Sequence, residues 1–357
     1  MTISLKIRYS NSFINYKKTT EIGFIIYAVP ESVAKIKNTH FIIAIDNSPS
    51  MVKNGNLDIA LKSAEKLLET LPQGNTVTII EFSNHPKIMY SGATGIKVNI
   101  NKESGATTRF YELITFIMAM ASQNPIPTKV ILLTDGKPID KRNIKDYEKL
   151  NIPKNMEIIS IGIGSDYNET ILSLLADKTS GIFYHIDDPS QLPTLFEEQT
   201  TNNVHALNLS ISVPQGFSPL NYDMPIKIPI VDRLISVYGI LTVPPGDKDY
   251  PVNIIANYDD PVTSQNKSLS YSVVLKRANE DVVNANLNKE VDAEIKYYKL
   301  LRDYTEALEK GKEATKIMTE LKQVAEETRK EDLIEYTQKM TGDAKTDLSA
   351  ATRKMRQ

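Results

Sequence analysis

Three oxygen-bearing side chains alternate directly after a short apolar run. Residues 41–45 read Phe-Ile-Ile-Ala-Ile, and Asp46, Ser48 and Ser50 follow. A continuous apolar run of this length predicts a buried parallel strand, and open α/β sheets bind ligands beyond the carboxyl ends of such strands. Carboxylate and hydroxyl oxygens are hard donors that suit Mg²⁺, Mn²⁺ or Ca²⁺ and not zinc. We therefore predict a divalent-cation site on this turn.

Two later segments can complete the cation site. Residues 105–108 read Gly-Ala-Thr-Thr and precede a predicted helix, and Asp135-Gly136 follows an apolar run over 129–134. The carboxyl ends of parallel strands meet at one edge of a sheet, so all three segments can converge there. Taken singly, Asp-Gly is commonly only a turn and Asp-x-Ser-x-Ser can cap a helix. The prediction therefore depends on the three segments together.

Strands and helices alternate from about residue 40 to residue 201. Apolar runs typical of buried strands cover 40–45, 76–82, 129–134, 156–164 and 181–186. Apolar residues recur with helical spacing over 57–71, 108–122, 169–178 and 190–198. This alternation predicts a doubly wound, Rossmann-like α/β domain over 37–202 that places the cation site at one edge of its sheet.

The segments on either side of this α/β domain have the alternating pattern of antiparallel strands. It occurs over 4–9, 21–29, 206–213, 233–243, 250–258 and 268–276. We expect residues 1–36 and 203–280 to form one antiparallel β-sandwich with the α/β domain inserted in it.

The C-terminal part is depleted in Gly and Pro. Apolar residues recur every three or four positions over 281–340, which predicts a helical domain of two or three antiparallel helices. Residues 341–357 hold few apolar side chains among many charges, and we expect a flexible tail there. This tail contains the hydroxyl residues Thr341, Thr346, Ser349 and Thr352.

Composition excludes several classes of function. The 357 residues carry a formal net charge of −2, which argues against a nucleic-acid binder, and the absence of Cys excludes disulfides and thiolate metal sites. The four histidines lack zinc-site spacing, and no nucleophile motif or acid/base pair is evident. No run of about 18 apolar residues occurs, so we expect a cytoplasmic protein that does not bind membranes.

The segment from about 38 to 201 resembles a von Willebrand factor type A (VWA) domain. The metal-ion-dependent adhesion site of that family reads Asp-x-Ser-x-Ser, then Thr, then Asp, and it is matched by five residues: Asp46, Ser48, Ser50, Thr107 and Asp135. Thr107 is preferred to Thr108 because it directly follows the small residues 105–106. The resemblance implies that Ser48 and Ser50 bind the cation, most readily Mg²⁺, with the aspartates acting partly through water.

The domain layout resembles two groups of VWA proteins. One comprises coat-protein subunits of vesicle traffic, and the other is an archaeal group in which a VWA protein works with a zinc-finger protein carrying a forkhead-associated (FHA) domain. The archaeal resemblance implies a non-enzymatic interaction module, phosphorylated by Ser/Thr protein kinases, opposed by a phosphatase, and bound by the FHA partner. It also implies control of archaellum expression and motility, by repression.

An exposed, flexible threonine is what phosphothreonine recognition by an FHA domain needs. The phosphorylation candidates are therefore the tail residues Thr341, Thr346, Ser349 and Thr352. Two alternatives stay open at this point: a VWA subunit that partners an AAA+ ATPase, and a coat or scaffold protein. A metal-dependent hydrolase is a more distant third, since no general base is evident beside the ion.

Overall fold

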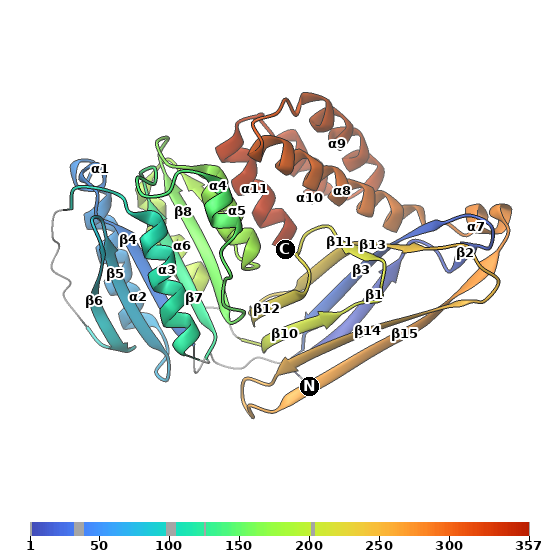
Figure 1. Ribbon diagram of the computed structural model, residues 1–357, viewed down its shortest axis with the longest axis horizontal. Coiled ribbons are helices and arrows are strands. Elements are labelled where there is room, and N and C mark those ends of the chain that lie inside the picture. Colours follow the sequence, from blue (N-terminus) through green and yellow to red (C-terminus); the bar gives the residue numbers. More distant parts are fainter. Residues whose placement is uncertain (1, 32–38, 98–104, 125, 201–203, 357) are drawn as a thin grey trace.

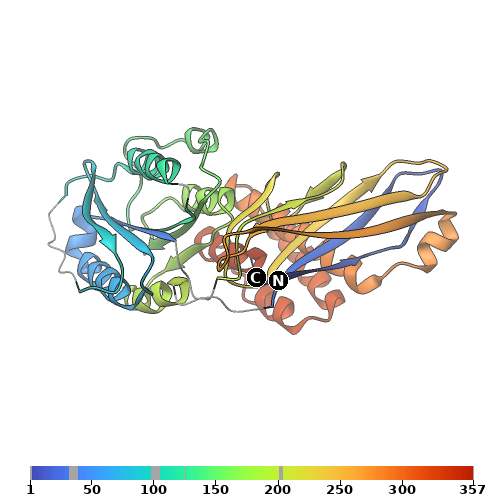
Figure 2. The ribbon, with the colours of Figure 1, turned by 90° about the horizontal axis from the view of Figure 1, so that it is seen from below.

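The computed structural model describes residues 2–31, 39–97, 105–124, 126–200 and 204–356. Figure 1 shows three parts side by side: an α/β domain, a two-sheet β-sandwich and a group of C-terminal helices that lies against both. The view from below in Figure 2 shows the α/β domain at one end of an elongated molecule and the long sandwich strands at the other. No helix among the described residues is both long and apolar enough to cross a bilayer.

The α/β domain is built on a six-stranded sheet with the order β6-β5-β4-β7-β8-β9. Strands β4, β5, β7, β8 and β9 are parallel, and β6 pairs antiparallel with β5. The strands are β4 (His40–Asp46), β5 (Thr76–Phe82), β6 (Pro86–Ala93), β7 (Thr128–Thr134), β8 (Met156–Ile163) and β9 (Phe183–Ile186). This confirms the predicted α/β fold and adds the edge strand β6, which the sequence patterns did not predict.

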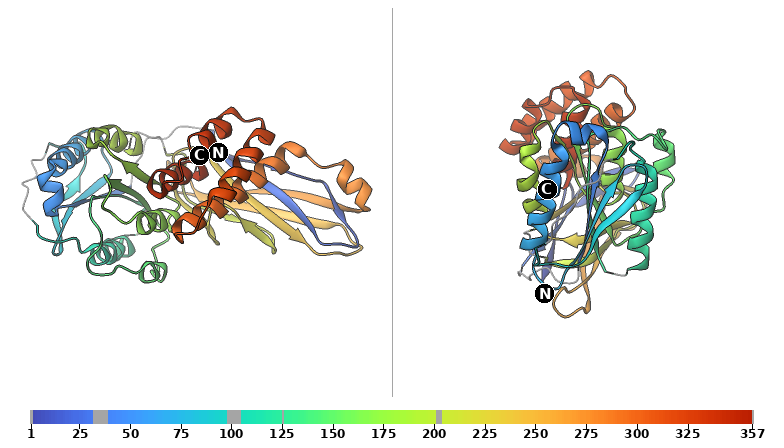
Figure 3. Two further views of the ribbon diagram at one scale, coloured as in Figure 1. Left: turned by 90° about the horizontal axis from the view of Figure 1, so that it is seen from above. Right: turned by 90° about the vertical axis from the view of Figure 1, so that its left-hand side faces the viewer.

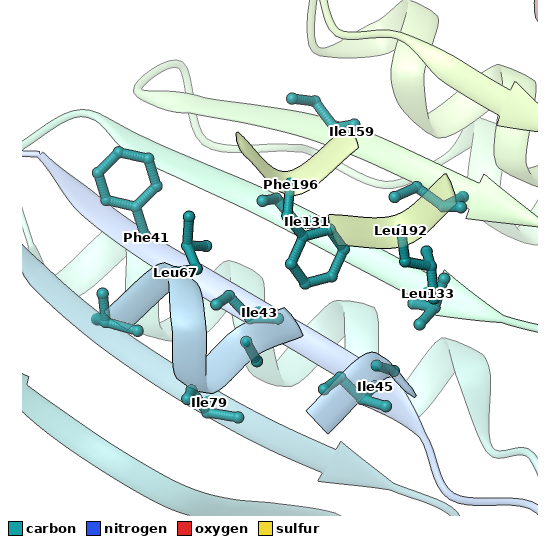
Figure 4. Close-up of a cluster of buried hydrophobic side chains, with 14 of the residues drawn as sticks. Phe41, Ile43, Ile45, Leu67, Ile79, Ile131, Leu133, Ile159, Leu192 and Phe196 are labelled. Carbon is teal, nitrogen blue, oxygen red and sulfur yellow. The ribbon is translucent and has the colours of Figure 1, made fainter. Parts of the chain in front are cut away.

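Helices cover both faces of this sheet. Phe41, Ile43 and Ile45 of β4 face one core, whereas Ile42 and Ala44 face the other. Figure 4 shows the first core, where β4 and its neighbouring strands pack against helices α2 and α6. Burial on both faces explains why β4 is continuously apolar. The helices are α1 (Pro49–Lys53), α2 (Asn56–Thr70), α3 (Phe110–Gln123), α4 (Ile144–Glu148), α5 (Glu169–Lys178), the 3-10 turn η1 (Pro189–Gln191) and α6 (Leu192–Thr200).

The β-sandwich combines strands from before and after the α/β domain, as predicted. One sheet has the order β1-β3-β13-β11 and the other the order β12-β10-β14-β15-β2. Its strands are β1 (Ile3–Tyr9), β2 (Phe13–Asn15), β3 (Thr20–Pro30), β10 (Ala206–Ser212), β11 (Phe217–Pro219), β12 (Ile226–Val231), β13 (Ile235–Val243), β14 (Tyr250–Asp259) and β15 (Asn266–Ala278).

The C-terminal helices pack on the sheet that contains β3 and β13. Tyr298 stacks on Tyr238 with ring centroids 3.5 Å apart. A Cβ atom at Gly23 would lie 2.7 Å from Ile295, so glycine allows the close approach of helix and strand. The helices are α7 (Glu280–Ala285), α8 (Lys289–Glu309), α9 (Thr315–Thr328), α10 (Glu331–Gln338) and α11 (Ala344–Arg356). Figure 3 shows this group from above, lying over both other parts.

The prediction of a flexible tail over 341–357 is wrong. Residues 344–356 form α11, which packs against β9 and α8. Its few apolar residues, Leu348, Ala351 and Met355, are buried, and several of its polar residues are buried as well. The sequence pattern misled because polar side chains in α11 are satisfied by tertiary hydrogen bonds instead of by water.

Buried ions join the α/β domain to the sandwich. Lys129 at the start of β7 lies 2.9 Å from Asp232 and 3.9 Å from Glu157, and all three side chains are almost fully buried. Arg233 contacts Asp232 at 2.9 Å and Glu157 at 3.7 Å. Asp232 and Arg233 directly follow sandwich strand β12. This network therefore connects the amino-terminal end of β7, in the parallel sheet, to the sandwich.

Candidate metal site

The structure brings Asp46, Ser48, Ser50 and Asp135 together beyond the carboxyl ends of β4 and β7. Ser50 Oγ lies 2.6 Å from Asp135 Oδ1, and Ser48 Oγ lies 3.3 Å from the same atom. The two serine hydroxyls are 3.0 Å apart. Asp46 Oδ1 accepts a hydrogen bond from the Ser48 backbone N–H at 2.9 Å, which holds the turn in place. Four oxygen donors therefore meet at one point of the sheet edge.

The fifth predicted residue, Thr107, lies elsewhere. Its hydroxyl is 3.1 Å from the Ser83 carbonyl oxygen and 2.8 Å from Asn84 Oδ1. Thr108 is buried, and its hydroxyl lies 3.1 Å from the position that a Cβ atom on Gly136 would take. That same position is 3.6 Å from Asp46 Oδ2. The predicted residue Thr107 thus has its hydroxyl bonded outside the cluster, whereas Thr108 lies beside Gly136, which Asp46 also borders.

Thr134 contacts the cluster, although the sequence pattern gave it no role beyond ending an apolar run. Its hydroxyl donates to Asp46 Oδ2 at 2.5 Å and thereby orients the carboxylate. The signal was present, since Thr134 ends β7 immediately before Asp135. Only the parallel pairing of β4 with β7, however, brings the ends of these two strands together.

The electrostatics of the cluster favour a cation. Burial and, to a smaller extent, the charge of Asp135 raise the pKa of Asp46 to about 7, against hydrogen bonds from Thr134 and Ser48 that lower it. Burial also raises the pKa of Asp135, against hydrogen bonds from Ser50 and Ser48. Neither carboxylate forms an ion pair with Lys, Arg or His in the described part of the chain. A bound cation would relieve the repulsion between them.

The donor set fits a hard divalent cation. Two carboxylates and the hydroxyls of Ser48, Ser50 and Thr108 are oxygen ligands of the kind Mg²⁺ takes, and few of them are anionic. The described residues contain no group of three or more His, Cys, Asp and Glu that could hold a metal, so hydroxyl oxygens are essential to this site. When bound, such a cation would offer an electrophilic position to a carboxylate from a partner.

The phosphorylation candidates fall into two classes. Thr341 and Thr346 are exposed, just before and within the first turns of α11. Ser349 and Thr352 are buried against β9: Ser349 Oγ accepts from the His185 N–H at 2.9 Å, and Thr352 Oγ1 accepts from the Phe183 N–H at 3.2 Å. The expectation that all four hydroxyls are exposed therefore holds for two of them and is wrong for the other two.

Comparisons with known proteins agree with this architecture. The von Willebrand factor type A domain family matches residues 41–198, and the archaellum regulatory network B, C-terminal domain family matches residues 289–357. VWA domains commonly carry a divalent-cation adhesion site. The C-terminal match spans α8 to α11, so α11 is part of that domain and not an appended tail. A comparison with curated proteins found no match.

Solved structures include relatives over the whole chain. The crystal structure of the ArnB paralog VWA2 from Sulfolobus acidocaldarius is 42% identical with a TM-score of 0.96, covering 100% of this chain and 98% of that one. A von Willebrand factor type A protein from Catenulispora acidiphila is 15% identical, with a TM-score of 0.71 and coverage of 98% and 96%.

The human COPII-coat protein Sec24c is 12% identical, with a TM-score of 0.56 and coverage of 90% of this chain and 58% of that one. At 15% and 12% identity, the second and third similarities concern the fold alone. The first relative extends over both matched regions at much higher identity. The chain therefore belongs to the family of von Willebrand factor type A proteins that carry the archaellum regulatory network B C-terminal domain.

Proposed function

We propose that this protein is a non-catalytic interaction module of an archaellum regulatory network, with two separate recognition elements. The first is a metal-ion-dependent adhesion site that holds Mg²⁺, or alternatively Mn²⁺ or Ca²⁺. The second is a set of phosphorylated Ser/Thr residues near α11 that an FHA-domain zinc-finger protein binds. Through these elements the protein acts in the repression of archaellum genes, under the control of Ser/Thr kinases and a phosphatase.

The convergence of Asp46, Ser48, Ser50 and Asp135 is the observation that carries the metal site. Serine hydroxyls 3.0 Å apart and within 3.3 Å of one carboxylate oxygen form a compact group of hard donors. Thr108 replaces Thr107 as the proposed threonine ligand because its hydroxyl lies beside Gly136, which Asp46 Oδ2 also borders. Thr134 supports the ligands by orienting Asp46.

Exposure supports Thr341 and Thr346 as the phosphorylation sites. A phosphate on either residue would present its oxygens to the arginines of an FHA domain. On Thr341 it would also replace the hydroxyl's hydrogen bond to Asp347. Ser349 and Thr352 have their hydroxyls bonded to the backbone of β9. They could become kinase targets only if α11 left that strand.

The experiment is a binding titration of the native protein against a purified FHA-domain protein. It compares untreated and phosphatase-treated protein, each with Mg²⁺ or with EDTA. We expect phosphatase to abolish binding and EDTA to leave it unchanged, because the two recognition elements are separate. The variants Thr341→Ala and Thr346→Ala locate the phosphothreonine, and Thr70→Ala serves as a matched control on an exposed threonine outside α11.

Other results would contradict parts of the proposal. Loss of binding with EDTA alone would place the FHA contact at the metal site. An absence of binding in every condition would remove the FHA partner. Phosphate mapped by mass spectrometry entirely within residues 37–202 would remove the C-terminal phosphorylation sites.

A further inference from the structure

The edge of strand β15 is unusually long and open. Residues 266–275 pair antiparallel with β14, and β2 pairs with β15 only at 276–278. No strand pairs with the other edge of 266–275 within the described residues. Figures 1 and 2 show β15 running along the outer margin of the sandwich.

The backbone of every second residue in this segment points outward. The Lys276 N–H donates to the Ser12 carbonyl oxygen at 2.9 Å, on the side away from β14. Because N–H and C=O of one residue point to the same side in an antiparallel strand, residues 268, 270, 272 and 274 also face the free edge. Four unpaired N–H groups and four unpaired C=O groups are thus presented in a row.

The other sheet edges in the molecule carry protective features that β15 lacks. Natural proteins protect edges with charges, proline, bulges, short strands or a covering helix. Strand β1 has Lys6 and Arg8, β12 has Pro229, and β6 starts with Pro86 and has an irregular register with β5. Strand β11 has three residues, and α11 covers β9. Residues 268–275 contain no charge and no proline, and their register with β14 is regular.

We propose that β15 is a homodimer interface, in which two copies of the chain pair antiparallel through this edge and join their five-stranded sheets into one. The two-fold axis lies at Tyr271, so that Ser270 pairs with the partner's Ser272, and Ser268 pairs with the partner's Val274. In this register the outward-facing backbone groups of both copies meet one another, as an antiparallel ladder requires.

The side chains suit a second copy of the same chain. Lys267 would face Leu275 of the partner subunit, so no like charges are opposed. Tyr271 would pair with Tyr271 of the partner subunit, and Leu269 with the partner's Val273, on the half-buried face of the strand. A neutral edge offers no charge with which to select a different protein, whereas the self-complementary register satisfies every outward group.

Size-exclusion chromatography with light scattering, over a series of protein concentrations, tests the proposal on the full chain. We expect the wild type to have twice the mass of one chain. Ser270→Pro removes one outward N–H from an edge position that tolerates proline, and we expect a monomer. Ser270→Ala keeps that N–H and should remain dimeric. Circular dichroism and thermal unfolding show whether each variant is folded.

A charge exchange keeps the test decisive if the proline variant does not fold. In S270K/S272K and in S270D/S272D, like charges face each other across the two-fold axis, so each variant alone should be monomeric. An equimolar mixture should form a heterodimer, because each lysine then faces an aspartate. A monomeric wild type at all concentrations, a dimeric Ser270→Pro, or a mixture that fails to associate would each overturn the proposal. The first of these results would leave the edge to an extended segment of another protein.

Discussion

Two groups of serine, threonine and aspartate side chains lie in different parts of this molecule and use the same chemistry differently. At the metal site, Ser48 and Ser50 direct their hydroxyls toward Asp135. On α11, Ser349 and Thr352 accept hydrogen bonds from the backbone of β9. Both groups are largely buried, yet the carboxylates of the first lack a cationic partner in the described part of the chain.

The carboxylate of α11 completes the contrast. Asp347 accepts from the Tyr304 hydroxyl at 2.5 Å, from the Gly342 N–H at 2.8 Å and from the Thr341 N–H at 3.1 Å. Asp46 and Asp135 also accept hydrogen bonds from the fold, but the charge of Asp135 raises the pKa of Asp46, and burial raises the pKa of both. A buried polar group that finds all its hydrogen-bond partners within the fold stabilises the structure. A buried carboxylate whose negative charge has no cationic partner in the fold is a candidate for binding a cation.

The largest expected effect is on stability at α11. Asp347→Ala removes the acceptor of four hydrogen bonds in a buried position, which leaves the Tyr304 hydroxyl and two N–H groups without their carboxylate acceptor. We expect the free energy of unfolding to fall by about 3 kcal/mol, measured by chemical denaturation. A loss below about 1 kcal/mol would show that water replaces the carboxylate and that α11 is not held in this way.

The same change at the metal site should act on binding instead. Asp46→Ala removes one of the two buried carboxylates, so we expect Mg²⁺ affinity to fall by about 100-fold, or about 2.7 kcal/mol, in isothermal titration calorimetry. The free energy of unfolding without metal should stay within about 1 kcal/mol of the wild type, because relief of the unfavourable burial and of the repulsion from Asp135 offsets the hydrogen bonds lost from Thr134 and Ser48. Unchanged Mg²⁺ affinity would refute the site assignment.

A third experiment addresses the contact between α11 and β9. Thr352→Val keeps the shape but removes the hydroxyl that bonds the Phe183 N–H at 3.2 Å and its carbonyl oxygen at 3.1 Å. We expect a loss of about 2 kcal/mol in unfolding free energy, since a buried N–H becomes unpaired. Faster hydrogen exchange at Phe183 would accompany it. Thr346→Val, at an exposed position of the same helix, is the matched control.

The two adjacent threonines of the metal-site loop give a paired comparison. Thr108→Val should weaken Mg²⁺ binding about 10-fold, or about 1.4 kcal/mol, whereas Thr107→Val should leave it unchanged. Calorimetric titration of both variants measures the difference. The reverse order of effects would restore Thr107 as the ligand.

The smallest expected effect is at Glu309 of α8, which accepts a hydrogen bond from Ser173 of α5 at 3.2 Å. This carboxyl group has one partner from the fold but is also disfavoured as a charge, so it lies between Asp347 and Asp46 in character. Burial and, to a smaller extent, the charge of Asp177 raise the pKa of Glu309 from its ordinary 4.5 to about 7. The Glu309 carboxyl group thus binds its proton more tightly in the folded protein than in the unfolded chain. The stability that this difference contributes is fully present below pH 4.5 and is lost as the pH rises toward 7. Glu309→Gln should reduce that loss by on the order of 1 kcal/mol.

Denaturation of the wild type and the Glu309→Gln variant at pH 5 and pH 8 checks this prediction, and Glu306→Gln serves as a control. Glu306 is paired with Arg302 and Lys310, and its pKa is lowered by those contacts. An identical pH dependence in wild type and Glu309→Gln would show that Glu309 is solvated.

Much of the architecture was predictable from local sequence patterns. Strand β4 is buried on both faces, which requires the apolar run at residues 41–45, and helix α2 is buried on one face, which requires its helical spacing of apolar residues. Both patterns can therefore be recognised in the sequence. The convergence of the motif residues Asp46, Ser48, Ser50 and Asp135 could also be predicted, because parallel strands bring their carboxyl ends to the same edge of the sheet. Short strands such as β2 and β11 were missed, since three residues carry no periodicity.

The errors arose where polar residues have tertiary partners. The prediction of a tail fails at α11 because Asp347, Ser349 and Thr352 have the polar character of solvated residues, and only the fold supplies β9 and Tyr304 as their partners. Thr107 and Thr108 are chemically identical neighbours, so only the path of the loop decides which one faces Asp46.

The sequence alone therefore determined the alternation of strands and helices in the α/β domain and four of the oxygen donors, Asp46, Ser48, Ser50 and Asp135, because burial and strand direction follow from local apolar patterns. The tertiary structure decided which hydroxyls are free for a ligand, since that depends on partners contributed by residues far away in the chain. It also decided which sheet edge is left open at β15, because pairing is a property of the assembled sheets and not of one strand.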